Sequence, residues 1–411
     1  MKTLVSKLAG RLERGFVFLT LFLSAEANIR FSSGVNYTEG NPLSQALWFG
    51  IYGITFCLVV VRWKRFIRVA TADKLLLLLV GIALGSIIWS VAPGVTLRRS
   101  VALVGTTLFG MYLASRYSPS ELLRLVAWTL GIGALLSLVA GLVLPSYGLS
   151  SGLWKGIYVQ KNALGRLMTV NAIILLLLTF SNRRYRWITG FGVGLSVGLV
   201  LLSGSKTALV AFINLLLLLP VYRALRWNYT IAVPFFIVLL LVGGSGIVLL
   251  LNDMETLLGA LGKDATLTGR TDIWDIAIEM INQRPLLGYG YNAFWLGSES
   301  EYSAYFWNFL DWEVPNAHNG FIDLGLDLGY LGISVFLLGF VMIYIRAVSW
   351  VRSTKTLEGL WPLEYMSFML ILTNSESLIL RYNNIYWVLY VAIALSTKTY
   401  GSRASKTVIT C

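Results

Sequence analysis

Histidine, cysteine and charge are all scarce in this chain of 411 residues. The two cysteines, Cys57 and Cys411, exclude a disulfide framework and a cysteine metal site. The single histidine, His318, leaves little scope for a histidine metal cluster. Charged residues make up only 13% of the chain, about half of the roughly 25% typical of soluble domains. With 56% hydrophobic residues and a mean hydropathy of +0.71, the composition indicates a protein of the lipid bilayer.

Long apolar runs fill most of the chain and are separated by short polar turns. They predict an all-α polytopic membrane protein with about twelve transmembrane helices, because the alternating pattern of a β-barrel is absent. Lys2, Lys7, Arg11 and Arg14 precede the first run as in a signal peptide, but no small-residue cleavage site and soluble domain follow, so we expect an uncleaved span. The predicted spans are roughly 15–32, 42–61, 74–92, 96–115, 121–144, 163–181, 187–203, 207–222, 229–251, 317–345, 362–380 and 385–397.

The distribution of lysine and arginine predicts the orientation of these spans. With both termini inside, 22 of the 33 basic residues fall on inside-facing segments and 11 on outside-facing ones. The net charge of +13 does not indicate nucleic-acid binding. Most of the excess lies in short loops such as 62–65 and 183–186, where orientation and lipid headgroups explain it.

One polar interruption divides the chain into three parts. Residues 1–251 are predicted to hold helices one to nine, 252–316 a large extracytoplasmic catalytic loop, and 317–411 helices ten to twelve with a cytoplasmic tail. Long loops without their own secondary structure are uncommon and usually functional. Most of the outside-facing cations border this loop, which suggests anion recognition at the outer face: Lys155, Lys161, Lys206, Lys263, Arg270, Arg284 and Arg381.

Inside the loop, the pattern from Asp272 to Ile281 predicts an amphipathic helix that ends at Arg284-Pro285. An aromatic-dense stretch follows, from Tyr289 to Trp312. These rings have two interpretations. They form a surface for sugar rings, or they belong to the belt of tryptophan and tyrosine found at membrane interfaces.

His318 lies where the loop re-enters the membrane as a helix, in Pro315-Asn-Ala-His-Asn-Gly. Imidazole exchanges a proton near neutral pH, and a helix N-terminus disfavours its charged form, which keeps the ring available as a base. The alternative is an interfacial histidine that caps the helix. The nearby outward-facing cations favour the catalytic interpretation.

Arg270 opens the predicted loop helix, where a guanidinium beside free N–H groups suits a phosphate or pyrophosphate. A salt bridge with Asp264 or Asp272 is the alternative. Lys206 lies in Ser203-Gly-Ser-Lys, which resembles a phosphate-binding loop but has Ser205 where that loop needs glycine. We therefore expect Lys206 to hold an anionic headgroup, or to extend its amine to the interface.

Lys161 begins the sixth predicted span and Arg166 follows one turn inward, where a buried cation needs a partner or a ligand. Arg284 and Arg381 complete the set of cations predicted to bind substrate. The candidate partners of these cations are acidic residues within the later spans, and pairing is favoured over proton transport: Asp323, Asp327 and Glu376.

Four stretches resemble the O-antigen ligase and polysaccharide polymerase superfamily, and within it the exopolysaccharide repeat-unit polymerases of the succinoglycan type. They are Trp89–Ser100, Trp154–Arg166, Gly269–Phe294 with Arg284-Pro-Leu-Leu-Gly-Tyr-Gly, and His318-Asn-Gly-Phe followed by Leu-Gly-Tyr-Leu-Gly. The resemblance implies a bacterial plasma-membrane glycosyltransferase that moves glycan from undecaprenyl pyrophosphate to a glycan or lipid-linked acceptor on the outer face. It also implies an inverting reaction without a metal or cofactor.

By this resemblance Arg270 would hold the pyrophosphate and His318 would act near the acceptor. The ligases carry an arginine where this chain has Lys206, which favours a polymerase over a ligase to lipid A-core. A loop carboxylate remains an alternative base, among Glu299, Glu301, Asp311 and Glu313. A transporter would be expected to show a repeated half and broken paired helices, which the sequence lacks. A non-enzymatic export component is the third interpretation.

Overall fold

The computed structural model describes residues 2–26, 41–181, 183–239, 270–310 and 312–409. Nearly every element in these ranges is a helix, which confirms the predicted all-α class. The helices are α1 (Lys2–Ser24), α2 (Pro42–Val61), α3 (Trp63–Ala70), α4 (Lys74–Gly85), η1 (Ser86–Ile88), α5 (Pro93–Arg116), α6 (Pro119–Val143), α7 (Pro145–Gly148), α8 (Lys161–Ser181), η2 (Arg183–Tyr185), α9 (Arg186–Leu202), α10 (Lys206–Ala224), an unlabelled helix Tyr229–Leu239, α13 (Arg270–Gln283), η3 (Gly297–Glu299), α14 (Glu301–Leu310), α15 (Gly320–Ser353), η4 (Leu357–Leu360), α16 (Trp361–Thr373) and α17 (Ile385–Ile409).

The only sheet in the described chain is an antiparallel hairpin of two short strands, β1 (Leu149–Ser150) and β2 (Leu153–Trp154), with two residues in each.

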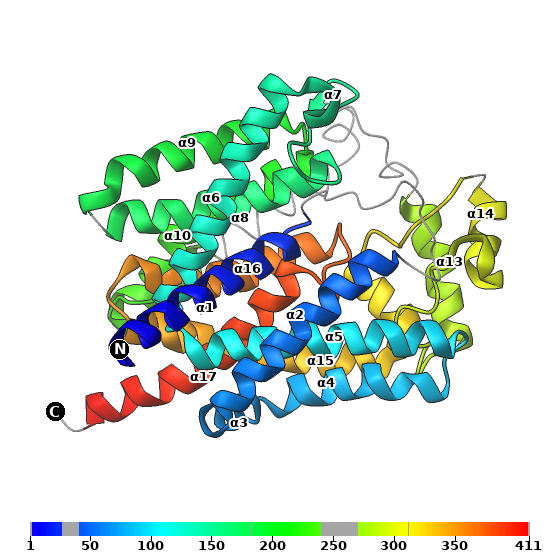
Figure 1. Ribbon diagram of the computed structural model, residues 1–411, viewed down its shortest axis with the longest axis horizontal. Coiled ribbons are helices and arrows are strands. Elements are labelled where there is room, and N and C mark those ends of the chain that lie inside the picture. The colour runs from blue at the N-terminus through cyan, green and yellow to red at the C-terminus, as the bar shows by residue number, and fades with distance from the viewer. Residues whose placement is uncertain (1, 27–40, 182, 240–269, 311, 410–411) are drawn as a thin grey trace.

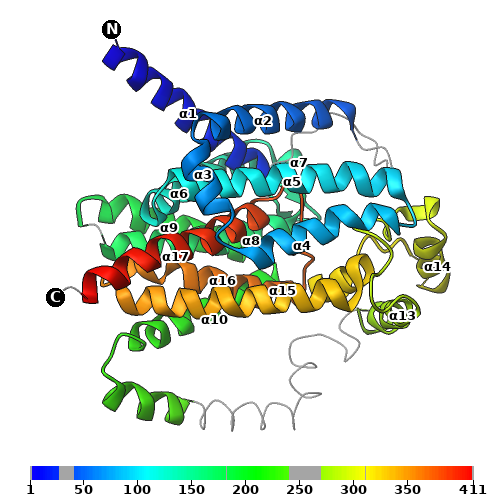
Figure 2. The same ribbon diagram turned by 90° about the horizontal axis from the view of Figure 1, so that it is seen from below.

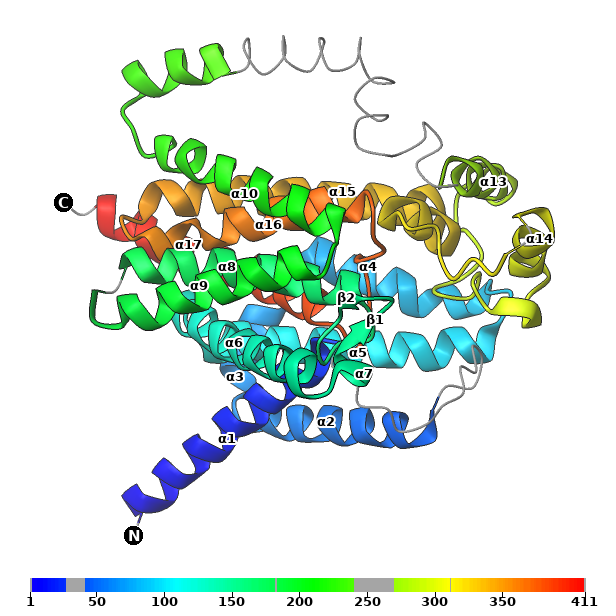
Figure 3. The ribbon, with the colours of Figure 1, turned by 90° about the horizontal axis from the view of Figure 1, so that it is seen from above.

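Most long helices run side by side in one bundle (Figure 3). The start of α1 and the end of α17 lie at one end of the bundle, while α13 and α14 lie at the opposite end (Figure 1). The view from below shows the same arrangement, with α8, α16 and α17 in the middle of the bundle (Figure 2). The two ends of the chain therefore share one side, and the described part of the predicted loop lies on the other.

Six helices of the described chain are long and apolar enough to cross a membrane, or seven if the bent pair of α3 with α4 and η1 forms one span. This is an α-helical, multi-pass membrane protein, but the predicted count of about twelve spans is not confirmed. Length explains part of the difference, because α4 and α16 have 12 and 13 residues whereas a span needs about 20. Residues 27–40 and 240–269, which include Lys263 and Asp264, lie outside the described residues.

Local sequence explains where several helices begin. Proline occupies the first turn of α5, α6 and α16, where its missing N–H costs nothing. Ser118 and Glu121 form a capping box at the start of α6. Asn319 caps α15, and its side-chain oxygen accepts from the N–H of Phe321 at 3.0 Å.

Helix α15 is broken at Gly329, whose φ of 63° and ψ of −165° are not helical. The loop after α13 lies against this break. Tyr289 and Gly290 donate backbone hydrogen bonds to Leu326 and Asp327 at 2.8 and 2.9 Å, and Tyr330 donates to Pro285 at 2.7 Å. The loop thus satisfies backbone groups that the break leaves without helical partners.

Glycine is required on both sides of this contact. A Cβ on Gly329 would lie 2.4 Å from the carbonyl carbon of Leu286, and one on Gly288 would lie 2.6 Å from the oxygen of Leu326. Both glycines also have positive φ. The two glycine-rich motifs that carried the family resemblance, Arg284–Gly290 and Leu328–Gly332, are therefore the two halves of one backbone contact.

The predicted amphipathic loop helix is confirmed as α13. Its apolar face packs with the aromatic stretch in a small core separate from that of the bundle. Tyr289, Phe294 and Phe306 are fully buried in this second core, and Trp295 packs against it. Most of these rings therefore hold the loop together. Tyr305, Phe309 and Trp312 stay exposed by 44% or more.

Candidate functional site

His318 occupies a constrained position directly before the cap of α15. Its φ is 49°, in the left-handed region that few non-glycine residues adopt. Its N–H donates to Oδ1 of Asn316 at 2.9 Å. Such strained positions persist only where the surroundings fix them, and they cluster at functional sites.

The Asp323 carboxylate fixes the segment that carries His318. It accepts hydrogen bonds from Nε1 of Trp295 at 2.8 Å and from the N–H of Ala317 at 3.0 Å, and a third from the hydroxyl of Ser377. Asp323 lies in the first turn of α15, so this clamp joins three separate segments. The expectation that Asp323 pairs with a cation is wrong for the described residues, because its partners there are neutral donors.

Arg270 is the first residue of α13, and its Nη1 donates to the backbone oxygen of Ser375 at 3.2 Å. That oxygen belongs to the connection between α16 and α17. Within the described residues Arg270 has no ion pair, so its charge is not neutralised by Asp272. The alternative partner, Asp264, lies outside the described residues.

The charge of Arg270 acts on the His318 ring. Burial lowers the pKa of His318 below its ordinary value of 6.5, and the cations Arg270 and Arg166 lower it further. The carboxylates of Glu376 and Asp323 oppose this by raising the pKa. The imidazole is therefore neutral at pH 7 and able to accept a proton.

Arg166 is buried inside the bundle and paired with two carboxylates. Its Nη2 lies 3.3 Å from Oε2 of Glu26, and its Nη1 forms an ion pair with Glu376. Asn384 donates to the other oxygen of Glu26 at 2.8 Å. The expected pairing of Glu376 with a basic residue is confirmed. Arg166 fixes Glu376 beside the segment that Arg270 contacts.

Lys161 and Lys206 begin α8 and α10, and these two helix ends pack together. A Cβ on Gly165 would lie 2.9 Å from the side chain of Ser205. Lys206 is exposed and Lys161 is half-buried. Lys161 and Lys206 therefore lie at the same end of this helix pair.

The remaining two predicted cations lie in different surroundings. Nε of Arg381 donates to the backbone oxygen of Ser377 at 2.9 Å, on the same connection that Arg270 contacts. Arg284 lies beyond the far end of α13, about 20 Å from Arg270 at a rise of about 1.5 Å per residue. Its guanidinium is 4.9 Å from the ring centroid of Tyr289 and 5.8 Å from that of Tyr302. Substrate binding by Arg284 stays a prediction, and its position indicates a role in holding the loop.

Three of the four alternative bases lie at the surface of the described chain. They are Glu299, Glu301 and Glu313, and each of them is exposed. Asp311 lies outside the described residues. No cluster of three or more His, Cys, Asp or Glu residues with metal-binding geometry occurs in the described parts of the chain.

Several residues of this region were not identified from sequence: Asn316, Ser375, Ser377, Asn384 and Glu26. Only Glu26 gave a usable signal, because a carboxylate in an apolar run is costly and usually paired. The others are small polar residues in connections, and their contacts reach across more than 50 positions.

Comparisons with known proteins show which family the chain resembles. A family described as O-antigen ligase matches residues 191–337, a range that contains Lys206, Arg270, Arg284 and His318. The chain is also 25% identical to the exopolysaccharide production protein ExoQ of Rhizobium meliloti (strain 1021) over 383 residues, which cover 85% of this chain and 87% of that protein. The predicted resemblance to the O-antigen ligase and polysaccharide polymerase superfamily is confirmed.

Proposed function

We propose that this chain is a glycosyltransferase that transfers or polymerises undecaprenyl-pyrophosphate-linked oligosaccharide at the outer face of the bacterial plasma membrane, in exopolysaccharide or O-antigen biosynthesis. The similarity to ExoQ over most of the chain supports the exopolysaccharide assignment. The position of Lys206, where the ligases carry arginine, favours polymerisation over transfer to lipid A-core.

One observation carries the proposal. Arg270 and the Asp323 clamp that carries His318 both contact the α16–α17 connection, at Ser375 and Ser377, and after burial the charge of Arg270 is the largest cause that lowers the pKa of His318. A fixed cation therefore lies beside a neutral base that is held by the Asp323 clamp. This pair suits a reaction in which an anion leaves while a hydroxyl loses a proton.

The proposed step balances without a further reactant. The acceptor hydroxyl oxygen attacks the anomeric carbon of the donor and forms the new glycosidic bond. The bond from that carbon to the pyrophosphate oxygen breaks, and its electron pair leaves with undecaprenyl pyrophosphate, whose charge Arg270 stabilises. Neutral His318 accepts the hydroxyl proton. Attack opposite the leaving group inverts the anomeric configuration.

The other cations fit the lipid-linked donor in this scheme. Lys161 and Lys206, at the joined ends of α8 and α10, would attract the pyrophosphate, and Arg381 would hold the α16–α17 connection or contact the donor directly. The exposed rings of Tyr305, Phe309 and Trp312 offer flat apolar surfaces to the glycan.

The arrangement of the bundle supports an extracytoplasmic site. If both termini are cytoplasmic, as the excess of lysine and arginine predicts, the opposite end faces outward. That end carries α13, α14 and the segments that surround His318 (Figure 1).

Incubation of purified protein with radiolabelled undecaprenyl-pyrophosphate-linked oligosaccharide tests the proposal. Longer lipid-linked glycans are expected, with release of undecaprenyl pyrophosphate. Product on added lipid A-core would instead identify a ligase. Labelled donor that stays chemically unchanged would contradict an enzymatic role and favour a transporter or export component. EDTA is expected to leave the rate unchanged, and a loss restored by one metal would contradict the metal-free step.

A further inference from the structure

A groove lies between α6, α8 and α9, in the half of α8 away from Lys161. Its volume is about 460 Å³, within the range of about 300–1,000 Å³ common for ligand sites. Helices α6 and α8, and α9 together with η2, are long and apolar enough to span a membrane. Trp128 and Phe191 on its rim are 67% and 66% exposed, so the groove opens sideways, where lipid surrounds the bundle.

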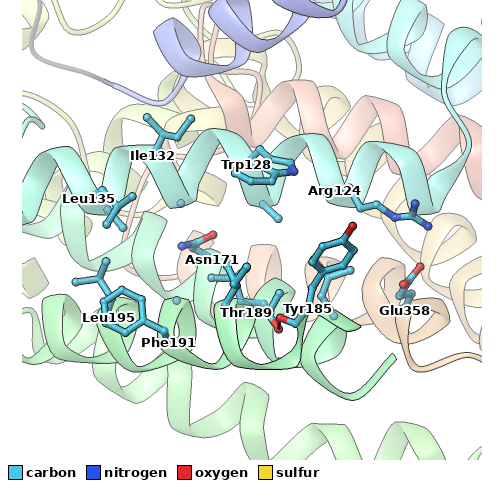
Figure 4. A pocket seen from close by; sticks show the side chains of 17 residues that line it. Arg124, Trp128, Ile132, Leu135, Asn171, Tyr185, Thr189, Phe191, Leu195 and Glu358 are labelled. Atoms are coloured by element: carbon cyan, nitrogen blue, oxygen red, sulfur yellow. Dashed lines mark hydrogen bonds between the residues drawn. The ribbon is translucent and has the colours of Figure 1, made fainter. Parts of the chain in front are cut away.

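One end of the groove is charged. Arg124 of α6 and Glu358 of η4 both lie at this end, beside Tyr185 (Figure 4). Neither side chain forms an ion pair with any residue that the structure describes. The rest of the lining is mainly apolar, so a cation and an anion lie together at one end of an apolar groove.

Asn171 marks the middle of the groove wall. Its side chain is fully buried, and its amide nitrogen donates to Oγ of Ser196 at 2.9 Å. Its Oδ1 accepts no hydrogen bond within the described chain. This oxygen would need a hydrogen-bond donor, so it does not select among occupants whose middle part carries only acceptors and apolar groups.

We propose that the groove binds one phospholipid with a zwitterionic aminoethyl phosphate headgroup. The phosphate contacts Arg124, the ammonium contacts Glu358, and an acyl chain fills the groove between α6 and α9. Glu358 distinguishes this occupant from an acidic phospholipid, because a carboxylate beside Arg124 repels a headgroup with only negative charge. The site is separate from the proposed transfer site and does not depend on it.

Native mass spectrometry of the purified full chain tests the proposal, with phosphatidylethanolamine as the probe and phosphatidylglycerol as the competitor. A Cβ at Gly131, in the groove wall, meets no atom within 4 Å. The substitution Gly131→Leu should therefore fill the groove without a clash. Gly194→Leu is the matched control, because Gly194 is also unobstructed and lies on α9 outside the lining.

The wild type and Gly194→Leu should each retain one phosphatidylethanolamine that Gly131→Leu loses. Arg124→Gln should weaken its binding by about tenfold or more, since a charge-assisted phosphate contact is removed. Glu358→Gln should remove the preference over phosphatidylglycerol. Equal retention by the wild type, Gly131→Leu and Arg124→Gln would overturn the site. Equal binding of both lipids by the wild type would overturn the headgroup assignment.

Discussion

His318 is the residue on which the proposed chemistry depends most closely. His318→Ala should lower turnover by about 10²–10⁴-fold, the usual value of general-base assistance, while donor binding changes little. Because burial and neighbouring cations lower the pKa of His318, wild-type activity should fall with acid at a lower pH than the ordinary pKa of histidine would give. Rates and donor affinity measured across pH test this. Wild-type turnover in His318→Ala would leave the histidine as a helix cap.

Asp323 is a positioning residue in this account. Asp323→Asn should lower kcat more than it raises KM, because an amide cannot accept all three hydrogen bonds of the clamp. It also removes a negative charge that raises the pKa of His318, so the acid limb of the pH profile should move to lower pH. Asp323→Glu, which keeps the charge, is the control. A lower rate with an unmoved acid limb would indicate a structural role alone.

At the scale of elements, the break in α15 is the feature that brings loop and bundle together. Gly329→Ala should destabilise the fold by about 1–3 kcal/mol, since its φ and ψ belong to a region that is essentially limited to glycine. The added methyl group would also overlap the backbone of Leu286. Gly339→Ala on the same helix is the control, because its Cβ would make only an ordinary contact of 3.6 Å with Leu75.

Thermal unfolding of the two variants in one detergent measures the difference. The Gly329→Ala protein should unfold at a clearly lower temperature than the Gly339→Ala protein. Equal unfolding temperatures would mean that the loop does not depend on this break.

Sequence patterns predicted the elements better than their contacts. The span at 42–61 coincides with α2, and 163–181 differs from α8 by two residues, because apolar length and flanking polar residues define such helices. The break at Gly329 could not be predicted, since its hydrogen-bond partners lie about 40 positions earlier in the chain. The sequence pattern of one segment does not specify which distant backbone groups that segment will contact.

At the scale of the whole molecule, the candidate site also depends on distant contacts that local sequence does not specify. Residue types alone identified Arg270 and His318 as chemically suitable. The pair of Arg166 with Glu26 joins positions 140 apart, and the Asp323 clamp joins three separate segments. Their assembly follows from the packing of the entire bundle.

The distribution of lysine and arginine over the whole chain predicts the orientation of the bundle. In a background without Cys57 and Cys411, a cysteine in place of exposed Glu313 should react with an impermeant thiol reagent in intact cells. A cysteine in place of exposed Lys355, in the connection before η4, should react only after permeabilisation, because the two positions lie at opposite ends of the bundle. The reverse pattern would place the site on the cytoplasmic side and contradict the proposed function.

The most direct test is the transfer rate of wild type, Arg270→Ala and Arg270→Lys with labelled lipid-linked oligosaccharide. Removal of a preorganised charge on the leaving group should cost about 10²–10³-fold in Arg270→Ala. Arg270→Lys should also be impaired, because lysine cannot grip an anion with two parallel hydrogen bonds. Arg68→Ala, at the exposed surface of α3, is the control and should keep the wild-type rate. Near-normal transfer in both Arg270 variants would remove this residue from the mechanism and contradict the account.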